Sequence, residues 1–289
     1  MSRILVIGSA GQLGQELQQT LVPYGEVVAV DRKTLDLSQP DQIRELVQQL
    51  QPQIVINAAA YTAVDQAEKE HETARMINAI APTILAQEVQ KLKALLIHVS
   101  TDYVFDGSKN HPYTENDIPN PLSIYGQSKL AGEQGIQENC QSYLILRTAW
   151  VYGAYGKSNF VKTMLRLGSE REEVRVVTDQ IGTPTWAKNI ADAIAQLTSL
   201  RPNTGIYHYT NSGVASWYDF AVAIFEEAKQ LGFPLKIQRV IPITTAEYPT
   251  PAQRPTYSVL SCRKISAVLN TYPPHWRQEL RQMLKSVNS

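Results

Sequence analysis

Two sets of residues in this chain have types and spacings suited to chemistry on a dinucleotide. The first is a glycine turn that directly follows an apolar run at residues 3–7, with glycines at Gly8, Gly11 and Gly14. The second is a tyrosine four residues before a lysine, Tyr125 and Lys129. The turn suits the phosphates of a dinucleotide, and the pair suits a proton donor beside it. Because a Tyr-x-x-x-Lys step is short, its value depends on its place after the glycine turn and an alternating series of strands and helices.

The glycine turn has a physical reason at each position. The first glycine permits a tight turn after the strand, the second lets the backbone approach a pyrophosphate, and the third lets the helix pack closely. The helix that follows would face the phosphates with free N–H groups. The spacing is G-x-x-G-x-x-G rather than the commoner G-x-G-x-x-G, so the turn alone is equally compatible with a purely structural role.

Asp31 favours a cofactor site, because it ends the next predicted strand about twenty residues on, where an acid can hold the adenosine ribose diol. An aspartate there can also simply close a turn. Arg32 and Lys33 follow directly and could instead bind a ribose phosphate. The sequence therefore leaves both NADH and NADPH open.

Tyr125 and Lys129 make a plausible acid–base unit on energetic grounds. A free tyrosine has a pKa of about 10, so bringing it near 7 needs about 4 kcal/mol of preference for the phenolate. An ammonium at about 4 Å supplies about 4 kcal/mol at an effective dielectric near 20, and a helix places residues four apart on one face. An exposed helical pair is the alternative interpretation. Ser100 and Thr101 end the preceding predicted strand, where a hydroxyl could bind a substrate carbonyl or cap the next turn.

The elements that must position these residues alternate along the chain. Apolar or β-branched runs predict strands at residues 3–7, 26–30, 54–56, 95–99 and 143–146. Helical spacing predicts helices at residues 12–21, 41–50, 73–91, 125–139, 159–167 and 216–231. This alternation predicts an α/β fold with a Rossmann-type, doubly wound parallel sheet covered on both faces. Beyond residue 150 the rhythm loosens, and that part should pack on the first.

Composition narrows the function classes. A chain of 289 residues allows one large domain or one and a half. Equal numbers of acidic and basic residues, 27 of each, argue against a nucleic-acid or membrane-surface role. Cys140 and Cys262 show neither disulfide nor zinc spacing, so we expect reduced packing residues. The chain runs from Met1 into a strand pattern without a signal-peptide pattern or a long apolar run, which predicts a cytoplasmic protein.

Several segments together resemble a known family. The glycine turn, Asn57-Ala58-Ala59-Ala60, Ser100-Thr101 and the Tyr125-x-x-x-Lys129 step resemble the extended short-chain dehydrogenase/reductase superfamily. Four longer segments resemble the dTDP-4-dehydrorhamnose reductases within it: AAAYTAVD at 58–65, STDYVFDG at 100–107, RTAWVYG at 147–153 and EYPTPAQRP at 247–255. The last two are long and lie outside the generic cofactor motifs, so they carry most weight.

The resemblance implies reduction of the 4-keto group of dTDP-4-dehydro-L-rhamnose to dTDP-L-rhamnose, with hydride from NADPH or NADH. Tyr125 would donate the proton, Lys129 would tune Tyr125 and hold the nicotinamide ribose, and Thr101 would bind the sugar. Further cofactor contacts are implied for Gly11, Gln12 and Leu13 at the pyrophosphate, Asp31 at the adenosine ribose, Asp36 and Leu37 at the adenine, and Ala60, Tyr61 and Thr62 at the centre.

The resemblance also implies a smaller sugar-nucleotide domain. We expect a cofactor domain over residues 1–152, to which segments near 186–212 and 253–262 return, and a mainly substrate-binding domain over residues 153–289. Asp102 and Trp150 fall on sugar positions, and the amphipathic ring of a tryptophan, although more often a core residue, can pack on a deoxysugar. Arg254 has a fork suited to the substrate diphosphate, and surface pairing is an equally good interpretation.

Other functions stay open. A nucleotide-sugar dehydratase or epimerase of the same superfamily is one, but dehydratases place a glutamate after the Thr-Asp step, where Tyr103 stands here. A 4-ketoreductase that makes another stereoisomer would look the same. A non-catalytic NADP-binding subunit that resembles the regulatory subunit of methionine adenosyltransferase is a third, disfavoured by the intact Tyr125, Lys129 and Thr101.

Oligomeric state and metal content are not fixed by the sequence. Some relatives dimerise around Mg²⁺ through acidic residues, and Glu16 is a candidate here, although a solvated helical glutamate is the favoured interpretation. We expect a dTDP-sugar as the partner, no metal, and either a monomer or a homodimer.

Overall fold

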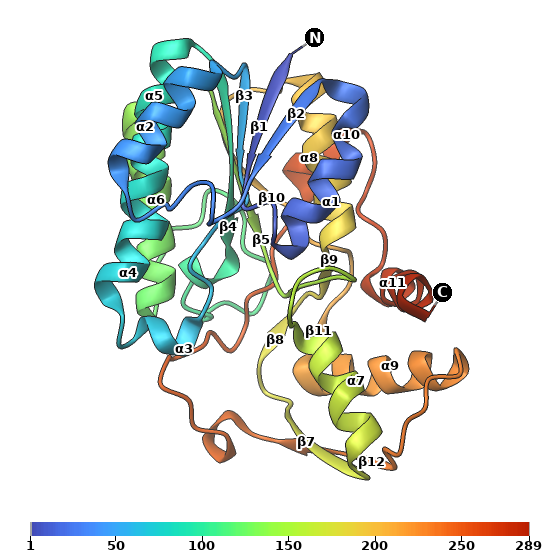
Figure 1. Ribbon diagram of the computed structural model, residues 1–289. Helices are drawn as coiled ribbons and strands as arrows, with labels where there is room; N and C mark the ends of the chain where they lie inside the picture. Colours follow the sequence, from blue (N-terminus) through green and yellow to red (C-terminus); the bar gives the residue numbers. More distant parts are fainter. Residues whose placement is uncertain (1, 289) are drawn as a thin grey trace.

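The computed structural model describes residues 2–288 and shows a large parallel sheet with helices on both faces above a smaller layer (Figure 1). In the described residues the sheet has six strands in the order β10-β5-β4-β3-β1-β2, every neighbouring pair parallel. Their bounds are β1 (Arg3–Ile7), β2 (Glu26–Val30), β3 (Ile54–Asn57), β4 (Leu95–Thr101), β5 (Tyr143–Thr148) and β10 (Gly205–His208). The predicted doubly wound α/β fold is confirmed.

Alternation along the first strand explains why both faces are covered. Ile4 and Val6 belong to one apolar core, and Leu5 and Ile7 belong to the other, so successive side chains serve opposite faces. The first core lies under α1 (Gln12–Thr20), α8 (Ala187–Leu200) and α10 (Arg263–Leu269). The second lies under α2 (Pro40–Leu50), α5 (Ala81–Leu92) and α6 (Ile124–Asn139). Strands that are buried on both faces are mostly apolar, which makes such runs recognisable in the sequence.

The helix predicted at residues 73–91 has a different internal structure. It begins as α4 (His71–Arg75), passes through a π-helical segment η2 (Met76–Ile80) and continues as α5. Gly132 of α6 packs against this segment so closely that an added Cβ would lie 2.1 Å from the carbonyl oxygen of Asn78. The π segment therefore brings Asn78 against α6, next to the turn that carries Tyr125 and Lys129.

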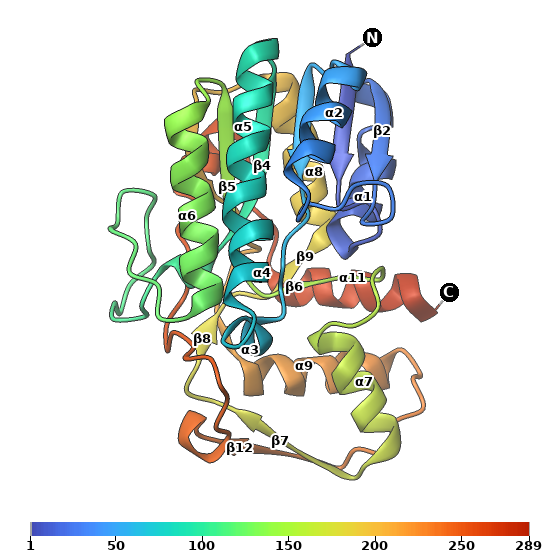
Figure 2. The same cartoon turned by 60° about the vertical axis from the view of Figure 1, so that its left-hand side comes forward.

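The smaller layer has its own core and lies below the carboxyl ends of the sheet strands (Figure 2). It contains α7 (Phe160–Glu170), α9 (Trp217–Gln230) and α11 (Trp276–Asn288), with β7 (Glu173–Val177) parallel to β12 (Arg239–Ile243). Two-residue strand pairs connect it to the upper part: β6 (Val151–Tyr152) with β9 (Thr185–Trp186), and β8 (Ile181–Gly182) with β11 (Ala215–Ser216). The predicted domain boundaries stay a prediction.

The chain passes more than once between the two parts, because α8 packs on α1 and β10 extends the large sheet beside β5. Both cysteines, Cys140 and Cys262, are free thiols. In residues 2–288 no helix has the length and apolar character that a membrane crossing would need.

Candidate active site

The glycine turn lies at the carboxyl edge of the sheet, at the point where the chain leaves β1 for β2 on one side and later for β3 on the other. Open α/β sheets bind ligands at such a switch point. Gly8 has a φ of +93°, which an L side chain rarely adopts, and its N–H is bonded to the carbonyl of Val30. A Cβ on Gly14 would lie 2.1 Å from the carbonyl oxygen of Gly8. The turn therefore tolerates glycine alone at Gly8 and Gly14, and α1 starts directly after it with no side-chain cap.

The adenosine end of the predicted site consists of two self-closing turns. Asp31 Oδ1 accepts hydrogen bonds from the N–H groups of Lys33 at 2.9 Å and Thr34 at 3.2 Å. Asp36 Oδ1 likewise accepts from the N–H and hydroxyl of Ser38, and these bonds lower its pKa. Leu37, which stands between Asp36 and Ser38 in the second turn, is buried in the core under α2 and α5. Asp31 therefore orders its turn through Oδ1, a role compatible with the predicted contact to a ribose.

Cofactor preference gives a first prediction. Asp31→Ala should raise the ratio of kcat/KM for NADPH to that for NADH, because the carboxylate repels a ribose phosphate and suits a free diol. Arg32 and Lys33 would then hold the phosphate without opposition. The measurement is the ratio of the two kcat/KM values, with Asp31→Asn as a variant that keeps the turn hydrogen bonds. An unchanged ratio would place Asp31 away from the ribose.

The centre of the site is fixed by Asn78. Its Oδ1 accepts from the N–H of Tyr61 at 2.8 Å, and its Nδ2 donates to the carbonyl of Tyr61 at 3.0 Å and to Ser128 Oγ at 3.0 Å. Ser128 in turn donates to the carbonyl of Tyr125 at 2.8 Å. The π segment thus ties the loop after β3, which carries Ala60, Tyr61 and Thr62, to the helical turn that carries Tyr125.

Tyr125 lies in the first turn of α6, where the Ser123 side chain caps the helix by accepting from the N–H of Gly126 at 3.2 Å. Its side chain is 8% exposed. Burial raises the pKa of Tyr125 to about 12, with a hydrogen bond from Thr101 acting in the opposite direction. The predicted lowering toward 7 is absent in this structure, because burial outweighs the groups around the phenol. At neutral pH Tyr125 carries its proton, which is the state a proton donor requires.

Lys129 is 1% exposed and points toward β4. It donates to the carbonyl of Val99 at 2.8 Å and lies 3.1 Å from Nε2 of His98. Burial lowers the pKa of Lys129 to about 8, and the nearby Glu133 carboxylate raises it. The amino group of Lys129 is therefore fixed by two contacts to β4.

Thr101 and Asp102 continue the site from the end of β4. Thr101 Oγ1 donates to Asp102 Oδ1 at 3.1 Å, and both side chains are buried. Burial raises the pKa of Asp102 to about 6, partly offset by hydrogen bonds. Asp102 Oδ2 is buried without a hydrogen-bond partner in residues 2–288. Protein atoms cover this oxygen and the Ser258 side chain acts on the same carboxyl, so the predicted contact of Asp102 with a sugar stays a prediction.

Tyr103 occupies the position where dehydratases carry a glutamate. Its ring packs edge-to-face against Tyr125 with centroids 5.6 Å apart. Burial raises the pKa of Tyr103 well above its ordinary value. The phenol of Tyr103 therefore stays protonated near neutral pH and cannot act as the base that an elimination requires.

Arg254 and Trp150 reach this edge from distant segments. Arg254 forms a two-pronged ion pair with Asp65, with Nη2 at 2.7 Å from Oδ2 and Nη1 at 3.0 Å from Oδ1. Trp150 has a φ of +46° and stacks on Trp217 with ring centroids 3.5 Å apart. Its other neighbour is Gly182, where an added Cβ would lie 2.5 Å from the indole. Both predicted substrate residues thus have structural partners, and their contacts to a substrate stay predictions.

The sequence matches a known protein family along its whole length. The family model described as "RmlD substrate binding domain" matches residues 1–289. The dTDP-4-dehydrorhamnose reductase of Escherichia coli K12 is 43% identical over 292 residues, covering 98% of this chain and 97% of that protein. The chain belongs to this reductase family.

Solved structures agree with this membership. The dTDP-4-dehydrorhamnose reductase of Bacillus anthracis, in complex with NADP, superposes with a TM-score of 0.92 at 41% identity and covers 99% of both chains. A UDP-glucose 4-epimerase of Thermus thermophilus in complex with NAD superposes with a TM-score of 0.83 at 20% identity, over 99% of each chain. At that identity the second likeness shows a shared fold only. As a member of the reductase family, the protein is an oxidoreductase.

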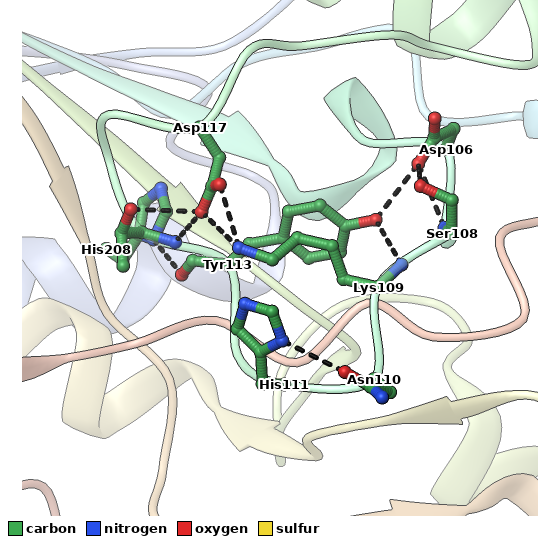
Figure 3. Close-up of polar contacts among 9 residues, drawn as sticks. Asp106, Ser108, Lys109, Asn110, His111, Tyr113, Asp117 and His208 are labelled. Atoms are coloured by element: carbon green, nitrogen blue, oxygen red, sulfur yellow. Dashed lines mark hydrogen bonds and ion pairs between the residues drawn. The ribbon is translucent and has the colours of Figure 1, made fainter.

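The loop between η3 (Asp102–Val104) and α6 is tied to the edge strand β10 of the large sheet (Figure 3). His208 of β10 contacts the carbonyl of Tyr113 at 3.2 Å through Nδ1. Tyr113 stacks on Phe105 with centroids 4.2 Å apart and donates to Asp106. Within the loop Lys109 pairs with Asp117 at 2.7 Å, which lowers the pKa of that carboxyl to about 2. These contacts fix a long excursion that has no helix or strand of its own.

The interpretation of Glu16 as a solvated glutamate is wrong. Its side chain is 6% exposed between α1 and α8, where burial raises its pKa and Lys188 and Asp192 act electrostatically on it. Local spacing could not show this, because the covering helix lies far along the chain. In residues 2–288 no three His, Cys, Asp or Glu side chains are grouped so as to hold a metal ion.

Sequence reasoning missed three residues that shape the site: Asn78, Asp65 and His98. The signal for His98 was present, since it is a single ionisable residue inside an apolar strand. Asn78 matters only because of the π segment, and Asp65 only through a contact with Arg254 that spans 189 residues. Neither of these two has a local sequence pattern.

Proposed function

We propose that the protein catalyses the NADPH-dependent reduction of the 4-keto group of dTDP-4-dehydro-L-rhamnose to dTDP-L-rhamnose, in the biosynthesis of nucleotide sugars for polysaccharides. The observation that carries this proposal is the burial of Tyr125 and Lys129 beside Thr101, at the same sheet edge as the glycine turn. The family membership and the NADP complex of the Bacillus anthracis relative support the cofactor. Use of NADH as well remains part of the proposal.

The residues at the switch point suit a dinucleotide. Gly8 and Gly14 let the turn pack tightly on neighbouring backbone, and the uncapped start of α1 offers N–H groups to an anion. We assign Gly11, Gln12 and Leu13 to this contact, and Asp31 to the adenosine ribose. When bound, the reduced nicotinamide supplies the hydride that the carbonyl carbon accepts.

The proton steps follow from the protonation states of this chain's own residues. Tyr125 keeps its hydrogen at neutral pH and donates it to the oxygen of the carbonyl as negative charge develops there. Thr101 donates to Asp102 Oδ1 in this structure, and its hydroxyl would turn from there to give the carbonyl oxygen a second hydrogen bond. Lys129 lies one helical turn from Tyr125, and in its ammonium form it would favour the phenolate that the proton transfer leaves. We assign Asp102 to a sugar hydroxyl, which its second carboxylate oxygen would accept once the substrate opens access to it.

Competing functions are less well supported. A dehydratase needs a base where the chain has Tyr103, and the likeness to an epimerase shows the fold alone. A non-catalytic binding subunit has no need of a buried tyrosine, lysine and threonine at one sheet edge. The protein would work in the cytoplasm on a dTDP-sugar, as a monomer or a homodimer.

The test of this function is NADPH oxidation with the product of the preceding dehydratase and epimerase, followed at 340 nm with NADH compared in parallel. We expect stoichiometric oxidation and dTDP-L-rhamnose as the product. Binding of NADPH without oxidation by any dTDP-4-keto sugar would instead support a binding subunit.

Substrate recognition gives a second prediction. Arg254→Ala should weaken dTDP binding by roughly 10- to 150-fold, because a charge-assisted two-pronged contact is worth about 1.5 to 3 kcal/mol. The Arg254–Asp65 pair holds the guanidinium in place, and we propose that Arg254 exchanges Asp65 for the diphosphate when the substrate binds. The loss should shrink with added salt. The measurement is calorimetric titration of dTDP into protein with NADPH bound.

Two further variants make that test specific. Asp65→Asn removes the resident partner of Arg254 and should not weaken dTDP binding. Trp150→Ala should impair turnover of the keto sugar more than binding of dTDP, because the ring is assigned to the sugar. A folded Arg254→Ala variant that binds dTDP as tightly as the parent would make the arginine purely structural.

A further inference from the structure

A buried chain of hydrogen bonds runs behind Lys129 and ends at the loop after β3. Lys129 Nζ lies 3.1 Å from His98 Nε2, and it also donates to the carbonyl of Val99 at 2.8 Å. His98 Nδ1 lies 3.1 Å from Nδ2 of Asn57. Asn57 Oδ1 accepts from the N–H of Ala59 at 3.2 Å. The side chains of Lys129, His98 and Asn57 are each 1% exposed or less, so water does not compete for these bonds.

The pairing of β3 with β4 brings the members of this series of hydrogen bonds together. Asn57 ends β3 and is the direct register partner of His98 in β4, so their side chains leave the sheet on the same face. That face is the one covered by α6, which carries Lys129. His98 is neutral, because burial holds its pKa well below its usual range and a charge on Lys129 would lower it further. A neutral imidazole has one donor nitrogen and one acceptor nitrogen.

The direction of donation follows from the backbone end of the chain. The Ala59 N–H occupies the oxygen of Asn57, so the Asn57 amide nitrogen faces His98 and donates to Nδ1. The imidazole then carries its hydrogen on Nε2, directed at Lys129 Nζ. An ammonium has no lone pair with which to accept that hydrogen, whereas a neutral amine has one. This arrangement therefore belongs to Lys129 in its amine form.

Charged groups around Lys129 allow both of its forms. Glu133, one turn along α6, favours the ammonium, but it is itself bonded to Arg147 of β5 at 2.6 Å. Tyr125, one turn back, is neutral at working pH. Asp102 lies beyond Tyr125 and acts electrostatically on that phenol. The two states of Lys129 are thus close enough in free energy for its neighbours to select between them.

We propose that His98 is a positioning residue whose tautomer changes with the ionisation of Lys129 and so couples that lysine to the cofactor loop. When Lys129 takes up one proton, Nε2 must become an acceptor, the single imidazole hydrogen moves to Nδ1, and Asn57 turns its oxygen toward it. The ring stays neutral, and the Ala59 N–H is released from Asn57. The role of Lys129 in turnover rests on the proposed function, whereas the tautomer change does not.

The direct test is the ¹⁵N spectrum of histidine side chains in the full-length protein from pH 6 to 10, without substrate. The His98 signals are assigned by their loss in His98→Gln. We expect hydrogen on Nε2 at high pH and on Nδ1 at low pH, with no imidazolium in the range. In Lys129→Met the exchange between tautomers should vanish. A single unchanging tautomer in the parent, or a charged ring, would overturn the proposal.

The activity test uses two variants with opposite expected shifts. The glutamine of His98→Gln can always present an amide oxygen to the Lys129 ammonium. This acceptor stabilises the ammonium and raises the pKa of Lys129, so the alkaline limb of the kcat–pH profile should move up by about one pH unit. His98→Leu removes the acceptor, so that limb should move down. An unmoved limb in both folded variants would contradict the coupling. If the parent protein has no turnover, the proposed function fails, and the nitrogen spectra still decide the role of His98.

Discussion

Tyr125→Phe is expected to lower turnover by at least about 10²-fold, the usual loss when a general acid is removed. The phenol hydroxyl is the only group lost, and the ring that packs against Tyr103 remains. Because burial of a phenylalanine at this position costs nothing in desolvation, the fold should be retained. The measurement is kcat with NADPH and the keto sugar at saturation.

Two comparisons separate chemistry from structure in this variant. NADPH affinity, measured by quenching of protein fluorescence, should barely change, since the nicotinamide ribose is assigned to Lys129. Tyr207→Phe is the matched control, because that hydroxyl donates to the carbonyl of Asn203 at 2.7 Å on the edge strand, away from the site. Near-parental turnover by Tyr125→Phe would overturn the assignment of the proton donor.

Arg147→Met is expected to lower the free energy of unfolding by about 3 to 5 kcal/mol, because it leaves the Glu133 carboxylate buried without its partner. Arg147 and Glu133 are each 1% exposed and form a bidentate pair, with Nη2 at 2.6 Å and Nε at 2.9 Å from the carboxylate oxygens. The guanidinium also packs on the ring of Phe105 at 5.1 Å. The measurement is urea unfolding with linear extrapolation to water.

Two control variants test whether burial of the ion pair causes the loss of stability. Arg166→Met breaks an exposed pair with Glu170 on α7 and should cost no more than about 0.5 kcal/mol. The double variant Glu133→Leu with Arg147→Met removes both charges, so it should recover most of the stability lost by Arg147→Met alone. Equal stability losses for Arg147→Met and Arg166→Met would show that the buried pair is no more important than a surface pair.

Five strands of the large sheet, β1 to β5, could be predicted from the sequence because they are mostly apolar. The edge strand β10 was not predicted, because four residues ending in a histidine show no clear strand pattern. The two-residue strands that join the layers, such as β6 and β8, could not be predicted, because so short a segment carries no period. The helix at residues 73–91 was located by its apolar spacing, but the π segment at Met76–Ile80 leaves no mark in that spacing.

The site was predictable where it follows the order of strands. The glycine turn, Thr101 and Tyr125 each stand directly after or before an element whose end lies at one sheet edge. The electrostatics were not predictable in the same way, because the pKa of Tyr125 depends on its burial among residues of other segments, such as Ala67, Ala74 and Tyr103. His98 and Glu16 show the same limit, since in each case the decisive neighbour lies on another element.

Isotope labelling can follow the transfer of hydride from NADPH to carbon 4 of the sugar directly. The protein is given the dTDP-4-keto sugar and NADPH that carries deuterium at the transferred position of the nicotinamide ring, and the product is analysed by mass spectrometry and proton NMR. We expect dTDP-L-rhamnose with one deuterium, located at sugar carbon 4, formed in step with NADPH oxidation. A product without deuterium at carbon 4, or a sugar recovered unchanged while NADPH is bound, would contradict this hydride transfer.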